Sequence, residues 1–198
     1  STFSEYSVIA EISAAKINPS ADLNKICVLG CGVSTGWGAA MINPEVKPKS
    51  SCAIWGLGAV GLPSSKHAQH GSNKIYGFDI NKDKFEVAKK FGVTECFSPA
   101  DGDVKDWLLA REKWGVNYTY DCTGNVAVMK TALELATEAL ERAASLESLL
   151  LAKSFRLDHS SLLLEDSGKE LLLEMEVSED VPKLVNKVIS GELNIDDY

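Results

Sequence analysis

Between residues 51 and 124, short apolar runs alternate with longer stretches in which apolar residues recur every three or four positions. The runs have the length of buried strands, and the longer stretches have the period of helices that pack one face against a sheet. Strands are expected at residues 51–56, 74–79, 94–97 and 118–124, and helices at 59–72, 81–92 and 103–114. This order predicts the α/β class, with a doubly wound parallel sheet and helices on both faces.

The expected helix at 59–72 departs from this pattern. Its sequence, AVGLPSSKHAQHGS, is polar in the middle and carries Pro63 and Gly71. A helix that packs on a sheet shows an apolar stripe, and an interior Gly or Pro costs about 1 to 3 kcal/mol. We therefore expect a short, exposed helix or one that has diverged at a cost in stability. With no acid or thiol nearby, His67 and His70 are interpreted as a solvated pair and not as metal ligands.

The segments on either side of this alternation follow other patterns. Residues 29–41, LGCGVSTGWGAAM, are rich in small residues that let a helix or loop approach another backbone closely. From 125 to 155, leucines at helical spacing and few β-branched residues predict helix. Residues 161–177 hold two apolar triplets around the tripeptide DSG, which fits a hairpin or a helix break. A last helix is expected at 181–193.

Composition narrows the class of protein. The chain has 198 residues, of which 45% are hydrophobic and 24% charged, enough for one domain with its own core. Its net charge of −8 argues against nucleic acid or an anionic membrane surface as the main partner, because both need basic patches, although it leaves room for a local basic site. No stretch approaches the ~18 consecutive apolar residues of a membrane span. The opening sequence, STFSEYSVIA, has no basic flank followed by an apolar segment, as a secretory signal would.

Five cysteines make an odd count in a chain that needs no disulfides for stability. Reduced thiols and a cytoplasmic location are therefore expected. Ser1 is not a start methionine, and the sequence opens on what looks like the middle of a strand. We expect a fragment or a processed chain.

The strongest motif is the sequence GLGAVG between an expected strand and an expected helix. In this G-x-G-x-x-G pattern Gly56 permits a tight turn, Gly58 lets the backbone approach a pyrophosphate, and Gly61 lets helix and strand pack closely. Asp79 ends the next strand, where a carboxylate accepts hydrogen bonds from the ribose hydroxyls of NAD and repels the 2′-phosphate of NADP. Lys84 would meet the other side of the same ribose. The alternative is a Gly-rich turn of another α/β protein, with Asp79 as a helix cap.

Several segments together resemble the zinc-containing medium-chain alcohol dehydrogenases, most closely the class III, glutathione-dependent formaldehyde dehydrogenase branch. They are STFSEYSVIAEISAAKINP, ICVLGCGVSTGWGAA, GLGAVGL, DINKDKFEVAKKFGVTEC and DCTGNVAVMKTALE. The resemblance is dense from Ser1 to about Glu134 and returns in DVPKLV near the C-terminus. It implies a Rossmann-type, NAD-binding domain at 46–198, preceded by a segment at 1–45 that leads from an absent catalytic domain.

The resemblance also assigns roles to residues. Thr35 and Val60 match residues that press the nicotinamide ring toward the substrate, and Cys122 and Thr123 fall where the family's chain passes the adenosine side and the nicotinamide ribose. The residues expected to contact NAD are Gly56, Leu57, Gly58, Ala59, Val60, Gly61, Asp79, Lys84, Cys122 and Thr123. A homodimer is expected on the same basis.

The resemblance implies that Cys31, in the GCG motif, is one of three protein ligands to a catalytic zinc, and it makes Cys31 and Thr35 the catalytic residues present. Three ligands leave the fourth zinc position open for an alcohol. From the residues alone, Cys31 would be interpreted as a buried free thiol. Cys27, Cys52 and Cys96 keep that interpretation as small buried side chains.

Two departures from the family limit what this chain should do. The other zinc ligands belong to a part that this sequence lacks, so we expect the 198-residue chain alone to be inactive. Residues 135–180 match the family poorly, because their composition is helical where strands are needed. The intact enzyme would oxidise a primary alcohol or S-(hydroxymethyl)glutathione with NAD and zinc. The alternative is a non-catalytic nucleotide-binding or structural protein derived from a dehydrogenase domain.

Overall fold

The computed structural model describes residues 4–41, 48–69, 71–136 and 177–195. Within these ranges the central element is a sheet of four parallel strands in the order β3-β2-β1-β4. The strands are β1 (Ser50–Trp55), β2 (Ser72–Phe78), β3 (Glu95–Phe97) and β4 (Tyr118–Asp121). This order matches the start of the 3-2-1-4-5-6 order of dinucleotide-binding sheets. The predicted parallel α/β sheet is confirmed.

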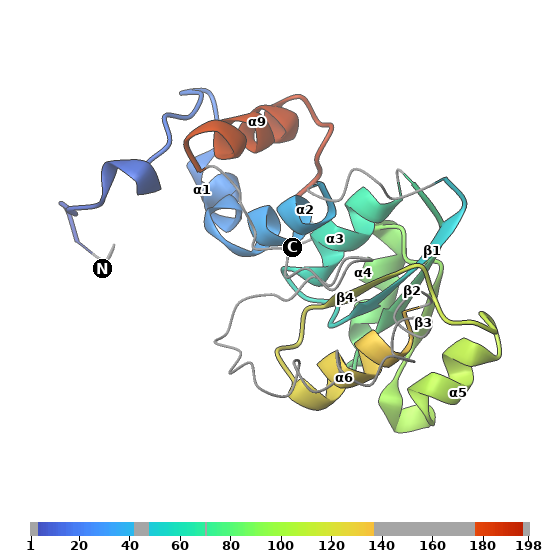
Figure 1. Ribbon diagram of the computed structural model, residues 1–198. Helices are drawn as coiled ribbons and strands as arrows, with labels where there is room; N and C mark the ends of the chain where they lie inside the picture. The colour runs from blue at the N-terminus through green and yellow to red at the C-terminus, as the bar shows by residue number, and fades with distance from the viewer. Residues whose placement is uncertain (1–3, 42–47, 70, 137–176, 196–198) are drawn as a thin grey trace.

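Helices cover both faces of this sheet, as the alternation predicts (Figure 1). Buried Cys52 and Ile54 of β1 face α3 and α4, whereas buried Ala53 and Trp55 face α5 and α6. The helices are α3 (Gly61–Ala68), η3 (Lys82–Lys84), α4 (Phe85–Lys90), η4 (Pro99–Asp101), α5 (Val104–Leu109) and α6 (Val126–Glu134). Each helix follows a strand and crosses back over one face, which keeps the next strand parallel.

A third core lies outside the sheet and joins the two ends of the described chain (Figure 1). Trp37, Val33 and Leu29 pack there against Leu184 and Val185, all of them buried. The elements involved are α1 (Leu23–Ile26), η2 (Cys27–Gly30), α2 (Gly32–Met41) and α9 (Val177–Ile189), with η1 (Glu11–Ser13) preceding them. The Gly-rich segment is therefore helical in its second half, and the helix near the C-terminus packs on it.

Four expected helices have other bounds in the structure. The helices expected at 59–72 and 103–114 are shorter, as α3 and α5, and the one expected at 81–92 is divided between η3 and α4. The helix expected at 181–193 begins earlier, at Val177, and ends at Ile189. Glu179 and Asp180 lie in its first turn, where acidic side chains complement the helix dipole, so the helix extends ahead of Pro182.

The helix predicted from 125 to 155 is wrong at residues 135 and 136. Helix α6 ends at Glu134, and Ala136 forms a parallel bridge with Val116, whose N–H donates to the Leu135 carbonyl oxygen at 2.9 Å. The chain therefore returns to the sheet beside β4, the place where a fifth strand of this order starts. The predictions for 161–177 and for the rest of 135–180 lie outside the described residues.

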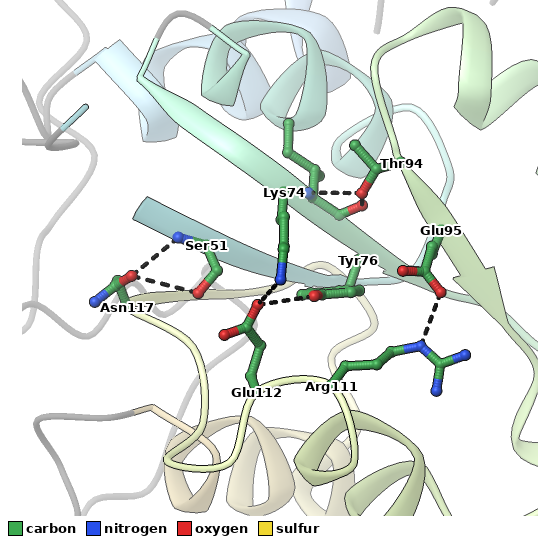
Figure 2. A network of polar contacts seen from close by, with 9 residues as sticks. Ser51, Lys74, Tyr76, Thr94, Glu95, Arg111, Glu112 and Asn117 are labelled. Atoms are coloured by element: carbon green, nitrogen blue, oxygen red, sulfur yellow. Dashed lines mark hydrogen bonds and ion pairs between the residues drawn. The ribbon is translucent and has the colours of Figure 1, made fainter. Parts of the chain in front are cut away.

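At the amino ends of the strands, polar side chains bind one another (Figure 2). The Glu112 carboxylate accepts from the Tyr76 hydroxyl at 2.8 Å and from the Lys74 ammonium at 2.9 Å. The Ser51 N–H and hydroxyl donate to the Asn117 side-chain oxygen at 2.9 and 3.3 Å, which joins β1 to the start of β4. We call these five residues the amino-end network.

Candidate functional site

Three loops meet at the carboxyl ends of the parallel strands. They follow β1, β2 and β4 and contain the GLGAVG motif, Asp79 and the sequence CTGN. The order of the sheet places β1 between β2 and β4, so the loop after β1 lies in the middle. The chain leaves β1 toward β2 and leaves β4 toward the other side of the sheet, and open α/β sheets bind ligands at such a switch point.

The three glycines of the motif each have a geometry that fits a ligand cradle. Gly56 has φ +89°, a conformation that favours glycine. A Cβ on Gly61 would lie 1.9 Å from the Gly56 carbonyl oxygen, so the helix start touches the loop. A Cβ on Gly58 would meet nothing within 4 Å in the described chain. The loop is therefore tight at both ends and open in the middle.

Asp79 fixes this loop from the end of β2. Its Oδ2 accepts from the Leu57 N–H at 2.8 Å and from the Lys84 ammonium at 2.9 Å, and its Oδ1 accepts from the Asn81 N–H at 2.8 Å. Burial alone would raise the pKa of Asp79, but the three hydrogen bonds and the Lys84 charge outweigh it and hold that pKa below its ordinary value. A buried carboxylate, charged at neutral pH, thus lies beside the open position of the loop.

The loop after β4 is organised by Asp121, which sequence analysis did not select. Its carboxylate accepts from the Thr123 hydroxyl at 2.6 Å, the Thr123 N–H at 3.2 Å and the Gly124 N–H at 3.3 Å. Asn125 then caps α6 by accepting from the Ala127 N–H at 2.9 Å. An Asp two residues before a Thr-Gly pair at a strand end is a sequence signal for such a turn.

Cys122 belongs to the same loop and touches the middle one. Its N–H donates to the Trp55 carbonyl oxygen at 2.8 Å, and its own carbonyl oxygen would lie 2.9 Å from a Cβ on Gly56. Burial, assisted by the Asp121 charge, raises the pKa of the Cys122 thiol to about 12. The thiol therefore stays protonated and offers no nucleophile or metal ligand at neutral pH.

The GCG segment also reaches this site, through α2. A Cβ on Gly32 would lie 2.9 Å from the Ala59 Cβ, and a Cβ on Gly36 only 2.0 Å from the Val60 carbonyl oxygen. Helix α2 therefore lies directly on the loop after β1, with its start at exposed Cys31. The structure thus brings the predicted residues of the first fifty positions to the predicted coenzyme loop.

Thr35 follows Cys31 by one helical turn, and its N–H donates to the Cys31 carbonyl oxygen at 2.8 Å. Its side chain is half-buried, like that of Val60 in the loop. Thr35 precedes Gly36 in the chain, and Val60 supplies the carbonyl oxygen that Gly36 approaches closely. The predicted nicotinamide contacts therefore share one junction between α2 and the loop.

The described residues do not make a zinc site. They contain no group of three or more His, Cys, Asp or Glu side chains that could hold a metal. Cys31 supplies one exposed thiol, whereas a catalytic zinc takes three protein ligands. The side chains of His67 and His70 lie outside the described residues, so their interpretation stays a prediction.

The other cysteines are free thiols. Burial raises the pKa of Cys52 to about 12 and that of half-buried Cys96 to about 11, which fits their interpretation as small packed side chains. The same prediction is wrong for Cys27, which is exposed. Across the part of the chain that the structure describes, no helix has the length and apolar character to cross a membrane.

The structure of α3 explains how a helix with a polar middle packs on the sheet. Ser64 and Ser65 are fully buried, so the expectation of an exposed helix is wrong. The Ser65 hydroxyl donates to the Leu62 carbonyl oxygen at 2.7 Å, and the Ser64 hydroxyl has carbonyl partners as well. Because each buried hydroxyl is bonded to a backbone carbonyl, these serines cost little when they pack.

This chain is similar in sequence to known dehydrogenases. Residues 56–144 match the family model described as zinc-binding dehydrogenase. Over 139 residues the chain is 51% identical to the Drosophila melanogaster protein named alcohol dehydrogenase class-3, covering 68% of this chain and 37% of that protein. S-(hydroxymethyl)glutathione dehydrogenase of Escherichia coli O1:K1 / APEC is 50% identical, covering 69% of this chain and 38% of that protein. The chain thus spans a little over a third of these relatives.

Solved structures agree on the fold. Benzyl alcohol dehydrogenase from Acinetobacter calcoaceticus has a TM-score of 0.70 and 22% identity, covering 92% of this chain and 51% of that chain. An alcohol dehydrogenase zinc-binding domain protein from Burkholderia ambifaria has a TM-score of 0.70 and 25% identity, covering 94% and 51%. The four-stranded sheet described above is therefore the Rossmann-type sheet of alcohol dehydrogenases.

Proposed function

Because this chain belongs to the zinc-containing medium-chain alcohol dehydrogenase family, we propose that its three carboxyl-end loops bind NAD for hydride transfer from an alcohol. The observation that carries the proposal is the buried Asp79 carboxylate beside the open position at Gly58. An acceptor at the end of β2 suits ribose hydroxyls, and an open glycine suits a pyrophosphate.

The residues present fit NAD in a definite arrangement. Asp79 and Lys84 would hold the ribose of the adenosine half at the end of β2. Residues 56–61 would receive the pyrophosphate, since a Cβ at Gly58 has no neighbour there in the described chain. Thr35 and Val60 would lie at the nicotinamide ring, and Cys122 and Thr123, in the loop after β4, would lie along the adenosine side and the nicotinamide ribose. Bound NAD would supply the hydride acceptor.

Zinc chemistry needs more ligands than the described residues supply. Cys31 is proposed as one zinc ligand of the whole enzyme, and no complementary set stands beside it in the described ranges. We expect the 198-residue chain with added zinc to form no NADH from an alcohol, although it binds NAD. Alcohol-dependent NADH formation by this chain alone would contradict that expectation.

The substrate and the assembly belong to the whole enzyme. We propose a primary alcohol or S-(hydroxymethyl)glutathione, because two relatives at about 50% identity are named for class III alcohol dehydrogenase and for S-(hydroxymethyl)glutathione dehydrogenase activity. We also propose a homodimer in the cytoplasm. The free state of the cysteines at positions 27, 31, 52, 96 and 122 supports a reducing compartment.

The experiment is a calorimetric titration of the purified 198-residue chain with NAD and, separately, with NADP. Saturable NAD binding at least about tenfold tighter than NADP is expected, because the Asp79 charge repels a 2′-phosphate. Absence of NAD binding, or equal affinity for both coenzymes, would overturn the proposal.

A further inference from the structure

Ser64 occupies an unusual place in α3. It is fully buried, and its hydroxyl lies 3.0 Å from the Gly36 carbonyl oxygen of α2 and 3.0 Å from the Val60 carbonyl oxygen of the loop after β1. One hydroxyl hydrogen is therefore shared between two carbonyl groups from different segments. Ser64 thus joins α2 to the start of α3 beside the proposed nicotinamide half of the coenzyme.

The contact is close because no side chain separates the segments. A Cβ on Gly36 would lie 2.0 Å from the Val60 oxygen and 3.1 Å from the Pro63 Cβ. Backbone thus meets backbone at this point, and the Ser64 hydroxyl is a donor within reach of a carbonyl oxygen on each side.

Ser65, the next residue, shows what an ordinary buried serine does in this helix. It is equally buried, but its hydroxyl donates only to the Leu62 carbonyl oxygen, within the same helix, among the described contacts. Its removal would leave the junction of α2 with the loop untouched. Both serines thus lie within hydrogen-bond distance of a carbonyl oxygen three or four residues earlier in the chain, and Ser64 differs by its additional contact with α2.

We propose that Ser64 is a positioning residue that sets the distance between α2 and the loop after β1, and so shapes the pocket for the nicotinamide end of NAD. The inference rests on the proposed function. Asp79 holds the adenosine half on the other side of β1, at the end of β2, and is bonded to Leu57, not to α2. Loss of the Ser64 hydroxyl should therefore weaken only the contacts of the nicotinamide half.

The test measures dissociation constants for NAD and for ADP-ribose, which lacks the nicotinamide ring, on the 198-residue chain. The variants are Ser64→Ala, Ser64→Cys, which keeps a donor but a larger and weaker one, and Ser65→Ala as the matched control. For Ser64→Ala we expect the NAD constant to rise about fivefold to tenfold, as for one lost hydrogen bond, and the ADP-ribose constant to change by less than about twofold. Ser64→Cys should show a smaller change of the same kind, and Ser65→Ala none.

Each result has one meaning. An equal loss for both ligands, or an unchanged ratio of the two constants, would overturn the positioning role, since a purely structural contact does not distinguish them. If Ser64→Ala fails to fold, the ratio for Ser64→Cys decides. If the unaltered chain binds neither ligand, the proposed function itself fails, whereas binding with an unchanged ratio defeats only this inference.

Discussion

The two ends of the sheet are built from the same four strands but are held together in different ways. At the amino ends, side chains bind other side chains, as in the contact of Glu112 with Lys74 and Tyr76 (Figure 2). At the carboxyl ends, buried Asp79 and Asp121 accept mainly from backbone N–H groups of the loops, together with the Lys84 ammonium and the Thr123 hydroxyl. A carboxylate that binds loop backbone fixes the shape of the loop and leaves the side chains around it free for a ligand.

This difference predicts that substitutions at the two ends affect different quantities, the free energy of unfolding at one end and NAD binding at the other. The amino-end network joins strands and connections through polar side chains at the end of the sheet away from the proposed coenzyme loops, so its loss should affect the free energy of unfolding alone. The carboxyl-end loops combine close backbone contacts at Gly56 and Gly61 with an open position at Gly58. Substitutions there should affect NAD binding, with or without a loss of stability.

The largest effect is expected for Gly61→Ala. The new Cβ would lie 1.9 Å from the Gly56 oxygen, which is backbone and must move. We expect a loss of about 3 kcal/mol or more in the free energy of unfolding, at the upper end for overpacking, together with loss of NAD binding. Urea unfolding and NAD titration measure both. Unchanged stability would mean that α3 does not contact the loop as described.

Asp79→Asn should have the next largest effect. The amide has one acceptor oxygen and cannot serve the donors that now reach both carboxylate oxygens, so we expect a loss of about 1 to 3 kcal/mol in the free energy of unfolding. NAD affinity should fall by at least about tenfold, since the charged ribose partner is removed.

The effect should depend on pH. Because the folded pKa of Asp79 lies below its unfolded value of about 3.9, its stabilising contribution is fully present above that pH and is lost as the pH falls through the folded pKa. The free energies of unfolding of the unaltered chain and of Asp79→Asn should be measured between pH 3 and 7. The difference between them should shrink at the acid end. A difference that grows in acid would contradict the hydrogen bonds assigned to Asp79.

Gly58→Ala separates binding from stability at the carboxyl ends. Its Cβ meets nothing within 4 Å in the described chain, and Gly58 has no left-handed conformation, so the unfolding free energy should stay within about 0.5 kcal/mol or rise slightly. NAD affinity should fall by about tenfold, because the methyl group occupies the approach of the pyrophosphate. The same titration and unfolding measurements apply. Full NAD affinity would show that the pyrophosphate lies elsewhere.

The smallest effect is expected for Tyr76→Phe, in the amino-end network. It removes one hydrogen bond to Glu112, which keeps its ion pair with Lys74, so we expect a loss of about 1 kcal/mol in the unfolding free energy. NAD affinity should not change. A fall in NAD affinity without a fall in stability would break the distinction between the two ends.

Much of the fold was predictable from the chain. The apolar runs and their spacing predict all four strands, and the alternation with helical segments predicts that they are parallel. Helix ends were less predictable, since Glu179 and Asp180 extend α9 ahead of Pro182. The prediction of helix at residues 135 and 136 was wrong because leucine spacing reports burial on one helix face, whereas Ala136 pairs with Val116 through backbone contacts that spacing does not encode.

The site residues could be predicted where a sequence motif indicates both a residue and its role. The glycine spacing and Asp79 fall at the strand ends that the fold requires, although their contact with a coenzyme stays a proposal. Ser64 was missed because a polar residue in a helix is expected to be exposed until the carbonyl oxygens of Gly36 and Val60 are seen beside it. Asp121 was missed because its role is to hold a turn, for which only a short local signal exists.

The central claim is that NAD binds at the carboxyl ends of β1, β2 and β4, and hydrogen exchange tests it most directly. Amide exchange of the 198-residue chain would be followed with and without saturating NAD. We predict slower exchange in residues 56–62, 79–84 and 122–125, with no change at Lys74, Glu112 and Asn117. Protection that falls at the amino ends, or no protection in the loop at 56–62 while NAD is bound, would contradict the account.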